Sequence, residues 1–177
     1  MGKILKSWSG MRKYLEKEML AESLKGRIRY NCTRYVGMDM DHIFEVYVDN
    51  KLVKQFSLET VNSYFLRMGI SSDKDNNIKN TIGIRGYWSD FWSTMSKYPM
   101  CDRDEYTDDE FCDALAIYRN SKILDSIESD NPIVRMFAIL DRRIGKRSLK
   151  EIKNKIGEQP EWLRFFYLLR IEAERVD

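Results

Sequence analysis

The chain of 177 residues contains a single histidine, His42, and only three cysteines, Cys32, Cys101 and Cys112. One histidine excludes histidine-rich zinc sites and metal triads that need two histidines. The three cysteines are far apart and no CxxC pair exists, so they do not form a disulfide framework. We therefore expect free thiols and a cytoplasmic location, where thiols stay reduced.

The chain also lacks the sequence motifs of common enzymes and of membrane proteins. No apolar run approaches the roughly 20 residues that a membrane span needs. No glycine-rich phosphate loop, GxSxG elbow or kinase signature is present. We therefore expect no catalytic residues, no cofactor, no metal and no membrane partner.

The residues that are present are sufficient for a folded protein with segregated charge. Apolar residues make up 43% of the chain and aromatic residues 12%, which excludes global disorder. The net charge is only +2, but residues 101–130 carry 3 basic and 10 acidic side chains, whereas residues 131–177 carry 11 and 7. An acidic middle beside a basic tail is the most informative global feature of this sequence.

The first hundred residues have the pattern of a small β-meander flanked by helices. Alternating apolar residues predict strands at residues 28–33, 42–48 and 52–57. Asp49-Asn50-Lys51 is expected to form a three-residue loop between the last two strands. That loop would place Val48 opposite Leu52 and Phe44 opposite Phe56.

The remaining residues predict helices alone. Capping signals begin helices at Thr107, Asn131, Ser148 and Gln159, and Gly145 is expected to close the second of them. We therefore predict an α+β fold with an α+β unit at residues 1–100, a helical subdomain at 101–177, and one shared core.

Helices opened by Pro132 and Pro160 repeat at an offset of 28 residues, which favours HEAT-like hairpins. An ordinary helical subdomain that reuses the same capping signals also explains this repeat.

Two groups of residues are candidates for a catalytic site. If Cys32 lies opposite Val46, His42 is about 13 Å away along the strand, which is too far for proton transfer. Asp49 and Lys51, preceded by Asp39 and Asp41, have the outline of a metal-dependent nuclease core. A hairpin turn explains Asp49-Asn50 on backbone grounds alone, so this nuclease stays a remote alternative.

A basic ridge is the first candidate binding surface. Residues 142–155 contain one acidic residue, Glu151, and seven basic ones: Arg142, Arg143, Lys146, Arg147, Lys150, Lys153 and Lys155. Arg27 and Arg29 add positive charge on the first strand. Such a ridge suits phosphate groups. A solvated helix surface, or pairing with the acidic segment 102–113, explains the same residues.

An aromatic-rich segment is the second candidate, because exposed aromatic residues beside charge are typical interface anchors. Its residues are Tyr87, Trp88, Phe91 and Trp92. The alternative is that these side chains pack the sheet onto the helices.

Short strings at the two ends of the chain carry a resemblance. They are Trp8-Ser9, Lys25-Gly26-Arg27, Thr33-Arg34-Tyr35, Val48-Asp49, Asn131-Pro132-Ile133-Val134-Arg135, Leu140-Asp141-Arg142-Arg143-Ile144-Gly145-Lys146-Arg147 and Trp162-Leu163-Arg164. With these strings the chain resembles a family of uncharacterised bacterial cytoplasmic proteins of similar size. The resemblance implies a bacterial or phage origin and a cytoplasmic location. It implies no catalytic residues, because that family has no assigned activity.

These observations lead to two functional hypotheses. The first is a non-enzymatic binding protein that acts on another macromolecule, a protein in the favoured version. An inhibitor or immunity-type protein in bacterial or phage conflict is one concrete form. The alternative is a nucleic-acid-binding protein that uses the basic ridge.

Overall fold

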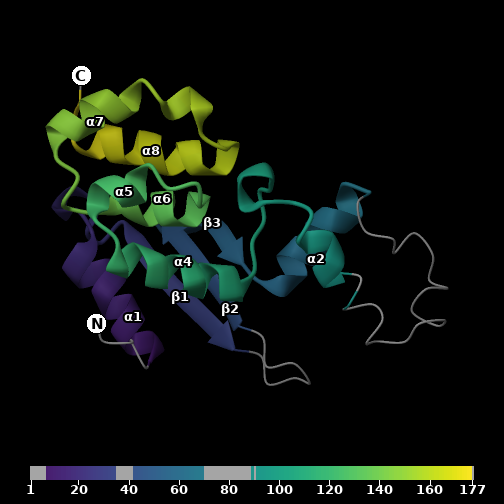
Figure 1. The fold of residues 1–177 in the computed structure, drawn as a ribbon. Coiled ribbons are helices and arrows are strands. Elements are labelled where there is room, and N and C mark those ends of the chain that lie inside the picture. The colour runs from purple at the N-terminus through teal and green to yellow at the C-terminus, as the bar shows by residue number, and fades with distance from the viewer. Residues whose placement is uncertain (1–6, 35–41, 70–88, 90, 177) are drawn as a thin grey trace.

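The computed structural model describes residues 7–34, 42–69, 89 and 91–176. It is an α+β structure in which an antiparallel sheet near the N-terminus is followed by helices (Figure 1). The strands are β1 (Ile28–Arg34), β2 (His42–Val48) and β3 (Lys51–Phe56), in the order β1-β2-β3. The predicted fold class and β-meander are therefore confirmed.

The turn between β2 and β3 is shorter than predicted. Val48 pairs with Lys51 and not with Leu52. Asp49 and Asn50 form a two-residue turn and both have positive φ, 49° and 65°. Tight hairpins favour these backbone angles because their twist matches that of the strands, and Asn and Asp tolerate them better than most residues.

The other predicted pair of this hairpin is confirmed, because Phe44 lies opposite Phe56. An irregularity between Val46 and Tyr47 shifts the register back by one residue. Both phenylalanines are thereby kept on the buried face of the sheet, where Phe44 stacks on Phe111 with ring centroids 4.6 Å apart.

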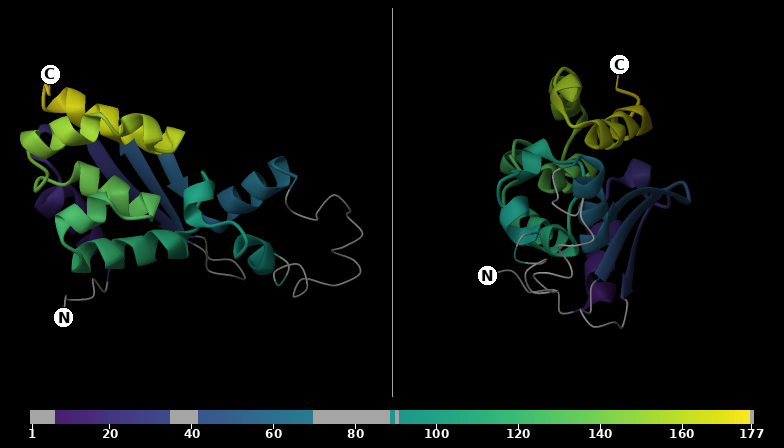
Figure 2. Two further views of the ribbon diagram at one scale, coloured as in Figure 1. Left: turned by 45° about the horizontal axis from the view of Figure 1, so that its top comes forward. Right: turned by 90° about the vertical axis from the view of Figure 1, so that its right-hand side faces the viewer.

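Helices cover this buried face, and the opposite face of the sheet stays open (Figure 2). The short helical turns are η1 (Tyr14–Met19), η2 (Glu22–Leu24), η3 (Met100–Asp102) and η4 (Ile156–Glu158). The α-helices are α1 (Trp8–Lys13), α2 (Leu58–Arg67), α4 (Asp108–Asn120), α5 (Ile123–Ile127), α6 (Pro132–Leu140), α7 (Lys146–Lys153) and α8 (Glu161–Ala173). None of the helices in the described part of the chain is long and apolar enough to cross a membrane.

Two of the predicted helix starts are confirmed, and the predicted start at Ser148 is wrong because Ser148 lies inside α7. Thr107 forms the predicted capping box of α4, and Asn131 caps α6 by accepting hydrogen bonds from two backbone N–H groups. Helix α6 ends at Leu140, however, and not at Gly145. Gly145 instead precedes α7, which begins at Lys146. The reason is the extended backbone of Asp141, described below.

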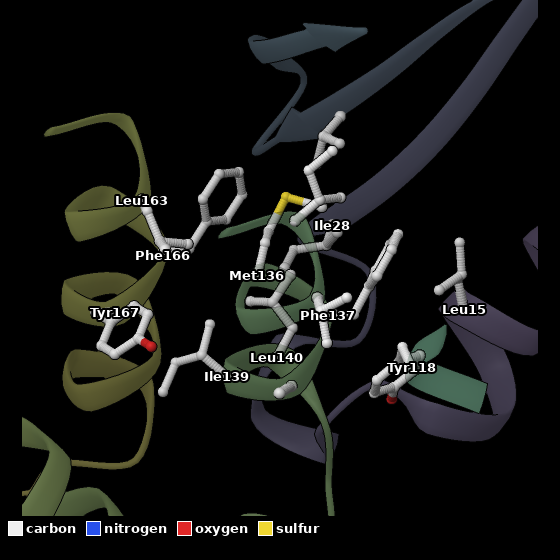
Figure 3. Packing of buried hydrophobic residues seen from close by; sticks show 14 of the residues in the cluster. Leu15, Ile28, Tyr118, Met136, Phe137, Ile139, Leu140, Leu163, Phe166 and Tyr167 are labelled. Carbon is white, nitrogen blue, oxygen red and sulfur yellow. The ribbon is translucent and has the colours of Figure 1, made fainter. Parts of the chain in front are cut away.

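Helix α6 lies at the centre of the molecule, and every one of its residues except Arg135 is buried. Figure 3 shows its side chains between Tyr167 and Phe166 of α8 on one side and Tyr118 of α4 on the other. The buried cluster around α6 contains residues from both sides of the predicted division at residue 100. HEAT-like repetition of these helices stays a prediction.

A second and smaller cluster lies apart from this core. It joins Val61, Tyr64 and Phe65 of α2 to Phe91. Figure 1 places α2 on the side of the molecule away from α7 and α8. The residues around α2 therefore depend on a separate set of apolar contacts.

Candidate basic interface

The turn between α6 and α7 is tied to the N-terminal segment by backbone hydrogen bonds. Ala21 N donates to Leu140 O at 2.9 Å, and Arg142 N donates to Met19 O at 2.8 Å. These two bonds hold the chain in the extended conformation that ends α6. The turn therefore has a defined position on the core, although it lies at the surface.

A buried carboxylate stabilises the same turn. The Asp141 side chain is 0% exposed and accepts a hydrogen bond from the Tyr118 hydroxyl. Arg143 donates to it from its backbone N at 2.7 Å, from Nε at 2.9 Å and from Nη2 at 2.6 Å. These donors compensate for the cost of burying the negative charge. Burial, together with the Asp141 charge, raises the pKa of Tyr118, which keeps its hydroxyl a donor.

Helix α8 contacts the turn through the side chain of Arg170, which is 2% exposed. Its Nη2 donates to Ile144 O at 2.9 Å, and its Nη1 lies 3.0 Å from Glu174 Oε1. The Ser23 hydroxyl also donates to Glu174, at 2.6 Å. The pKa of Arg170 is lowered by burial, which the neighbouring carboxylates partly oppose. The turn, α8 and the N-terminal segment thus form one connected polar network.

Outside the exposed group described below, three members of the predicted ridge have intramolecular partners. Lys153 Nζ donates to Val176 O at 3.5 Å. Arg143 neutralises Asp141, as described above. Lys155 Nζ lies 3.0 Å from Glu128 Oε1. These three side chains have intramolecular partners, so they contribute less to a binding surface than the sequence indicates.

Four other cations of the ridge form an exposed group, which we call the basic surface: Arg142, Lys146, Arg147 and Lys150. Arg147 is 96% exposed, and its Nε lies 3.8 Å from Glu151. Among the described residues, no ion pair joins the other three cations to an acid. The opposite face of α7 is anchored in the core by Leu149 and Ile152.

The start of α7 adds to this positive charge. Its N-cap is Gly145, which offers no side-chain hydrogen bond, and its first turn contains no acidic residue. The first helical residues are instead Lys146 and Arg147. The N-terminal end of a helix carries partial positive charge, so these cations are placed where an anion is favoured.

The acidic segment 102–113 does not neutralise the basic surface. Its carboxylates find other partners: Glu105 pairs with Lys54 at 2.8 Å, and Glu110 pairs with the buried Arg103. In the parts of the chain that the structure describes, no ion pair links this segment to the basic surface. The proposed intramolecular pairing of ridge and acidic segment is therefore absent there.

Comparison with known proteins identifies the family. A family model described as the SF0329 protein family matches residues 7–171. The chain belongs to the SF0329 protein family. The matched residues include the N-terminal segment, the Asp141 turn, α7 and all but the last residues of α8. No curated protein and no solved structure matches the chain.

Arg29 lies in β1 and Arg27 directly precedes it, and both arginines contact other side chains. Arg27 forms two hydrogen bonds to Asp49, at 3.0 and 2.8 Å, which lower the pKa of that carboxyl. The Arg29 guanidinium lies 4.7 Å from the ring centroid of Tyr47. Neither arginine is joined to the basic surface by a contact that we observe.

The nuclease alternative needs Asp49 as a metal ligand, but the Asp49 carboxylate is bonded to Arg27. The other two carboxylates of the nuclease candidate, Asp39 and Asp41, lie outside the described residues. Within the described ranges, no group of three or more His, Cys, Asp or Glu side chains could hold a metal ion. The nuclease stays a remote prediction.

The aromatic segment is divided between core and surface. Tyr87 and Trp88 lie outside the described residues. Phe91 is buried against Phe65, with ring centroids 5.9 Å apart, whereas Trp92 is 44% exposed. Phe91 packs with α2, which lies on the side of the molecule away from α7 (Figure 1). Of the aromatic candidates, the two that the structure describes, Phe91 and Trp92, therefore do not share a surface with the basic residues.

The predicted position of Cys32 is corrected by the strand register. Cys32 pairs with Phe44 and not with Val46, so His42 is two residues away, about 7 Å along the strand. Burial and the nearby Asp108 raise the pKa of the Cys32 thiol. A protonated thiol is a poor nucleophile, so the closer position does not create a thiolate site.

Sequence reasoning missed the buried polar network around Asp141. The string that carries the family resemblance includes Asp141 and Arg143, but nothing in it indicates that the carboxylate is buried. Its partner Tyr118 lies 23 residues earlier in the chain. No local pattern signals a contact over that separation.

Proposed function

We propose that this protein is a non-catalytic binding protein that docks an acidic protein partner through the basic surface. One observation carries this proposal: four exposed cations are held on an anchored turn and helix, and among the described residues no ion pair joins three of them to an acid. Groups whose orientation is set before binding lose less conformational freedom when they bind. Complementary charge then gives speed and specificity of association.

The extent of the basic surface favours a protein over a long nucleic acid. Helix α7 has eight residues and is about 12 Å long. The net charge of the whole chain is only +2, and the first turn of α4 is acidic through Asp108, Asp109 and Glu110. A long polyanion would meet this repulsion, whereas a compact acidic patch on a protein would not.

A competitive capture experiment tests the proposal. The tagged full-length chain is compared with a variant in which the four residues of the basic surface are replaced by alanine. A matched control replaces four exposed lysines elsewhere: Lys13, Lys17, Lys51 and Lys97. We expect the wild type and the control to retain one stoichiometric acidic protein after nuclease treatment. The basic-surface variant should bind it at least about 10-fold more weakly, because loss of the complementary charges slows association and speeds dissociation.

Equal capture by the basic-surface variant and the control would contradict the proposal. Nucleic acid binding is the second candidate, which the uncapped and basic start of α7 favours because such helix ends suit phosphate. That candidate predicts a captured species that nuclease removes. It also predicts that the fourfold variant reduces the slope of log affinity against log salt by about 4, one unit for each lost phosphate contact.

A further inference from the structure

Helix α8 exposes two large apolar side chains at the surface of the molecule. Leu168 is 56% exposed and Phe165 is 42% exposed. The two residues are three positions apart, so they lie on the same face of the helix, about one turn from each other. Figure 2 shows α8 at an outer edge of the molecule. This outer face is separate from the basic surface, which lies on α7 and the turn before it.

The inner face of α8 fixes the orientation of the helix. Leu163 and Phe166 are fully buried and lie against α6 (Figure 3). Arg170 is buried as well and bonds to Ile144 O. A rotation of α8 that buried Phe165 and Leu168 would expose these residues. The exposed apolar pair is therefore a fixed feature of the surface.

The charged residues of the outer face are arranged symmetrically about Leu168. Arg164 lies four residues before it and Glu172 four residues after it, and both are exposed. In an α-helix these positions are about 6 Å along the axis and about 40° around it from Leu168, in opposite directions. Glu161 and Arg175, seven residues before and after Leu168, are exposed and also opposite in charge. A half-turn that reverses α8 about Leu168 therefore exchanges positive and negative positions.

The charges of Arg164 and Glu172 are available for a partner. Nε of Arg164 donates to Gln159 O at 2.7 Å, which orients the guanidinium without neutralising it. Among the described residues, no ion pair joins Arg164 or Glu172 to an opposite charge. The pKa of Arg27 is raised chiefly by its hydrogen bond to Asp49 and least by the charge of Glu172. Glu172 thus has a distant cation within the chain but no direct partner.

We propose that two copies of this chain associate through α8, in antiparallel orientation around a two-fold axis at Leu168. In such a contact both copies use the same surface, so each interaction occurs twice. Leu168 packs against Leu168 of the second copy, between the two Phe165 rings. Arg164 of each copy faces Glu172 of the other. A parallel arrangement would instead place like charges together, so the charges select the antiparallel direction.

The size of this face sets the strength of the association. Helix α8 has 13 residues and is about 20 Å long. Stable interfaces bury roughly 800 Å² on each partner, and a single helix face with two large apolar side chains supplies less. We therefore expect a reversible dimer with a dissociation constant on the order of 100 μM. The proposal is independent of the partner that docks on the basic surface.

Cysteine cross-linking tests the position of the two-fold axis. A residue on the axis meets its own copy, so Leu168→Cys should give a covalent dimer on mild oxidation of the full-length chain. Cys101 is replaced by serine throughout, because its thiol is exposed. The matched control is Leu124→Cys, at an apolar residue of α5 that is 62% exposed. Non-reducing gels should show cross-linking at least about 5-fold faster for Leu168→Cys. Equal rates for the two variants would contradict the proposed axis.

Charge exchange tests the pairing across the axis. Arg164→Glu and Glu172→Arg each place like charges face to face, so each should raise the dissociation constant by about 10-fold or more. Both substitutions in one chain restore the opposite pairs and should return the constant to within about 3-fold of the wild type. Asp125→Arg on α5 changes an exposed charge elsewhere and should have no effect. Sedimentation equilibrium at concentrations up to about 1 mM measures all four variants.

Two results would overturn the proposal. One is a wild-type chain that stays monomeric at the highest concentration, as expected if a different protein covers α8. The other is a doubly exchanged variant that associates as weakly as the single variants. All substituted side chains are exposed, so loss of association without rescue is not explained by unfolding.

Discussion

Individual arginines of one short stretch have different roles in this protein. Arg142 and Arg143 are adjacent in the sequence. Arg143 is bound to the buried Asp141, whereas Arg142 is exposed to solvent. The difference arises from Asp141, whose carboxylate is 0% exposed and needs a cation nearby. A count of basic residues therefore overstates the charge that is available for binding.

Replacing Asp141 with alanine tests this assignment at the scale of one residue. The change leaves the buried Tyr118 hydroxyl without its acceptor, and Arg143 loses its partner. We expect the free energy of unfolding to fall by roughly 1–3 kcal/mol, the usual cost of an unsatisfied buried group. Urea denaturation measures it.

The matched control for that change is Asp113→Ala, which removes an exposed carboxylate from α4. It should alter the free energy of unfolding by no more than about 0.5 kcal/mol. If the two alanine variants unfold at the same urea concentration, Asp141 does not stabilise the turn in the way described here.

At the scale of the element, α7 combines a buried apolar face with an unusual start. Leu149 and Ile152 attach it to the core. Its N-cap is Gly145, and its first turn is basic, which is the opposite of the charge that a helix N-terminus favours. A helix of this kind is locally less stable than it could be, and an external anion relieves the repulsion.

The substitution Gly145→Asp at the start of α7 should change the stability of the protein and its binding to the partner in opposite directions. Gly145 has a φ of −87°, and a Cβ there meets no atom within 4 Å, so the substitution causes no strain. An aspartate cap should stabilise the protein by about 0.5–1 kcal/mol through capping and reduced chain entropy. The same negative charge should weaken capture of the acidic partner severalfold. Thermal unfolding and the capture assay measure the two effects.

Gly157→Asp supplies the matched control, because it adds the same charge beyond the other end of α7, where a Cβ also meets no atom within 4 Å. It should leave capture by the basic surface nearly unchanged. An increase of capture in Gly145→Asp would show that the start of α7 does not face the partner.

At the scale of the whole molecule, stability is divided between two sets of contacts. The main cluster surrounds α6 and joins the sheet to α4 and α8. The cluster of α2 contains Val61, Tyr64, Phe65 and Phe91 and is separate from it. Segments with fewer buried apolar contacts open with a lower free energy than the core.

Hydrogen exchange tests this division. Amide protons of α6 and β2 should exchange only through global unfolding, because their side chains are enclosed by the main cluster. Amide protons of α2 should exchange at least about 10-fold faster under the same conditions, through local opening. Equal protection of α2 and α6 would mean that the two clusters unfold as one unit.

Local residue patterns determined much of this fold. The alternation of apolar and polar residues located β1 and β2, since successive side chains of a strand point to opposite faces. Thr107 and Asn131 marked the starts of α4 and α6, because a capping side chain bonds to backbone groups only two or three residues away. Both signals depend on residues close in sequence, so the sequence alone contains them.

Only the tertiary structure decided which side chains are free. Leu140 ends α6 because its carbonyl accepts from Ala21, which lies 119 residues earlier in the chain. Arg143 is occupied because Asp141 is buried, and Arg170 is occupied because it reaches Ile144 O, 26 residues earlier in the chain. Such contacts join residues that are distant in sequence, and their energies depend on burial and exact separation. Those quantities are absent from the sequence until the chain has folded.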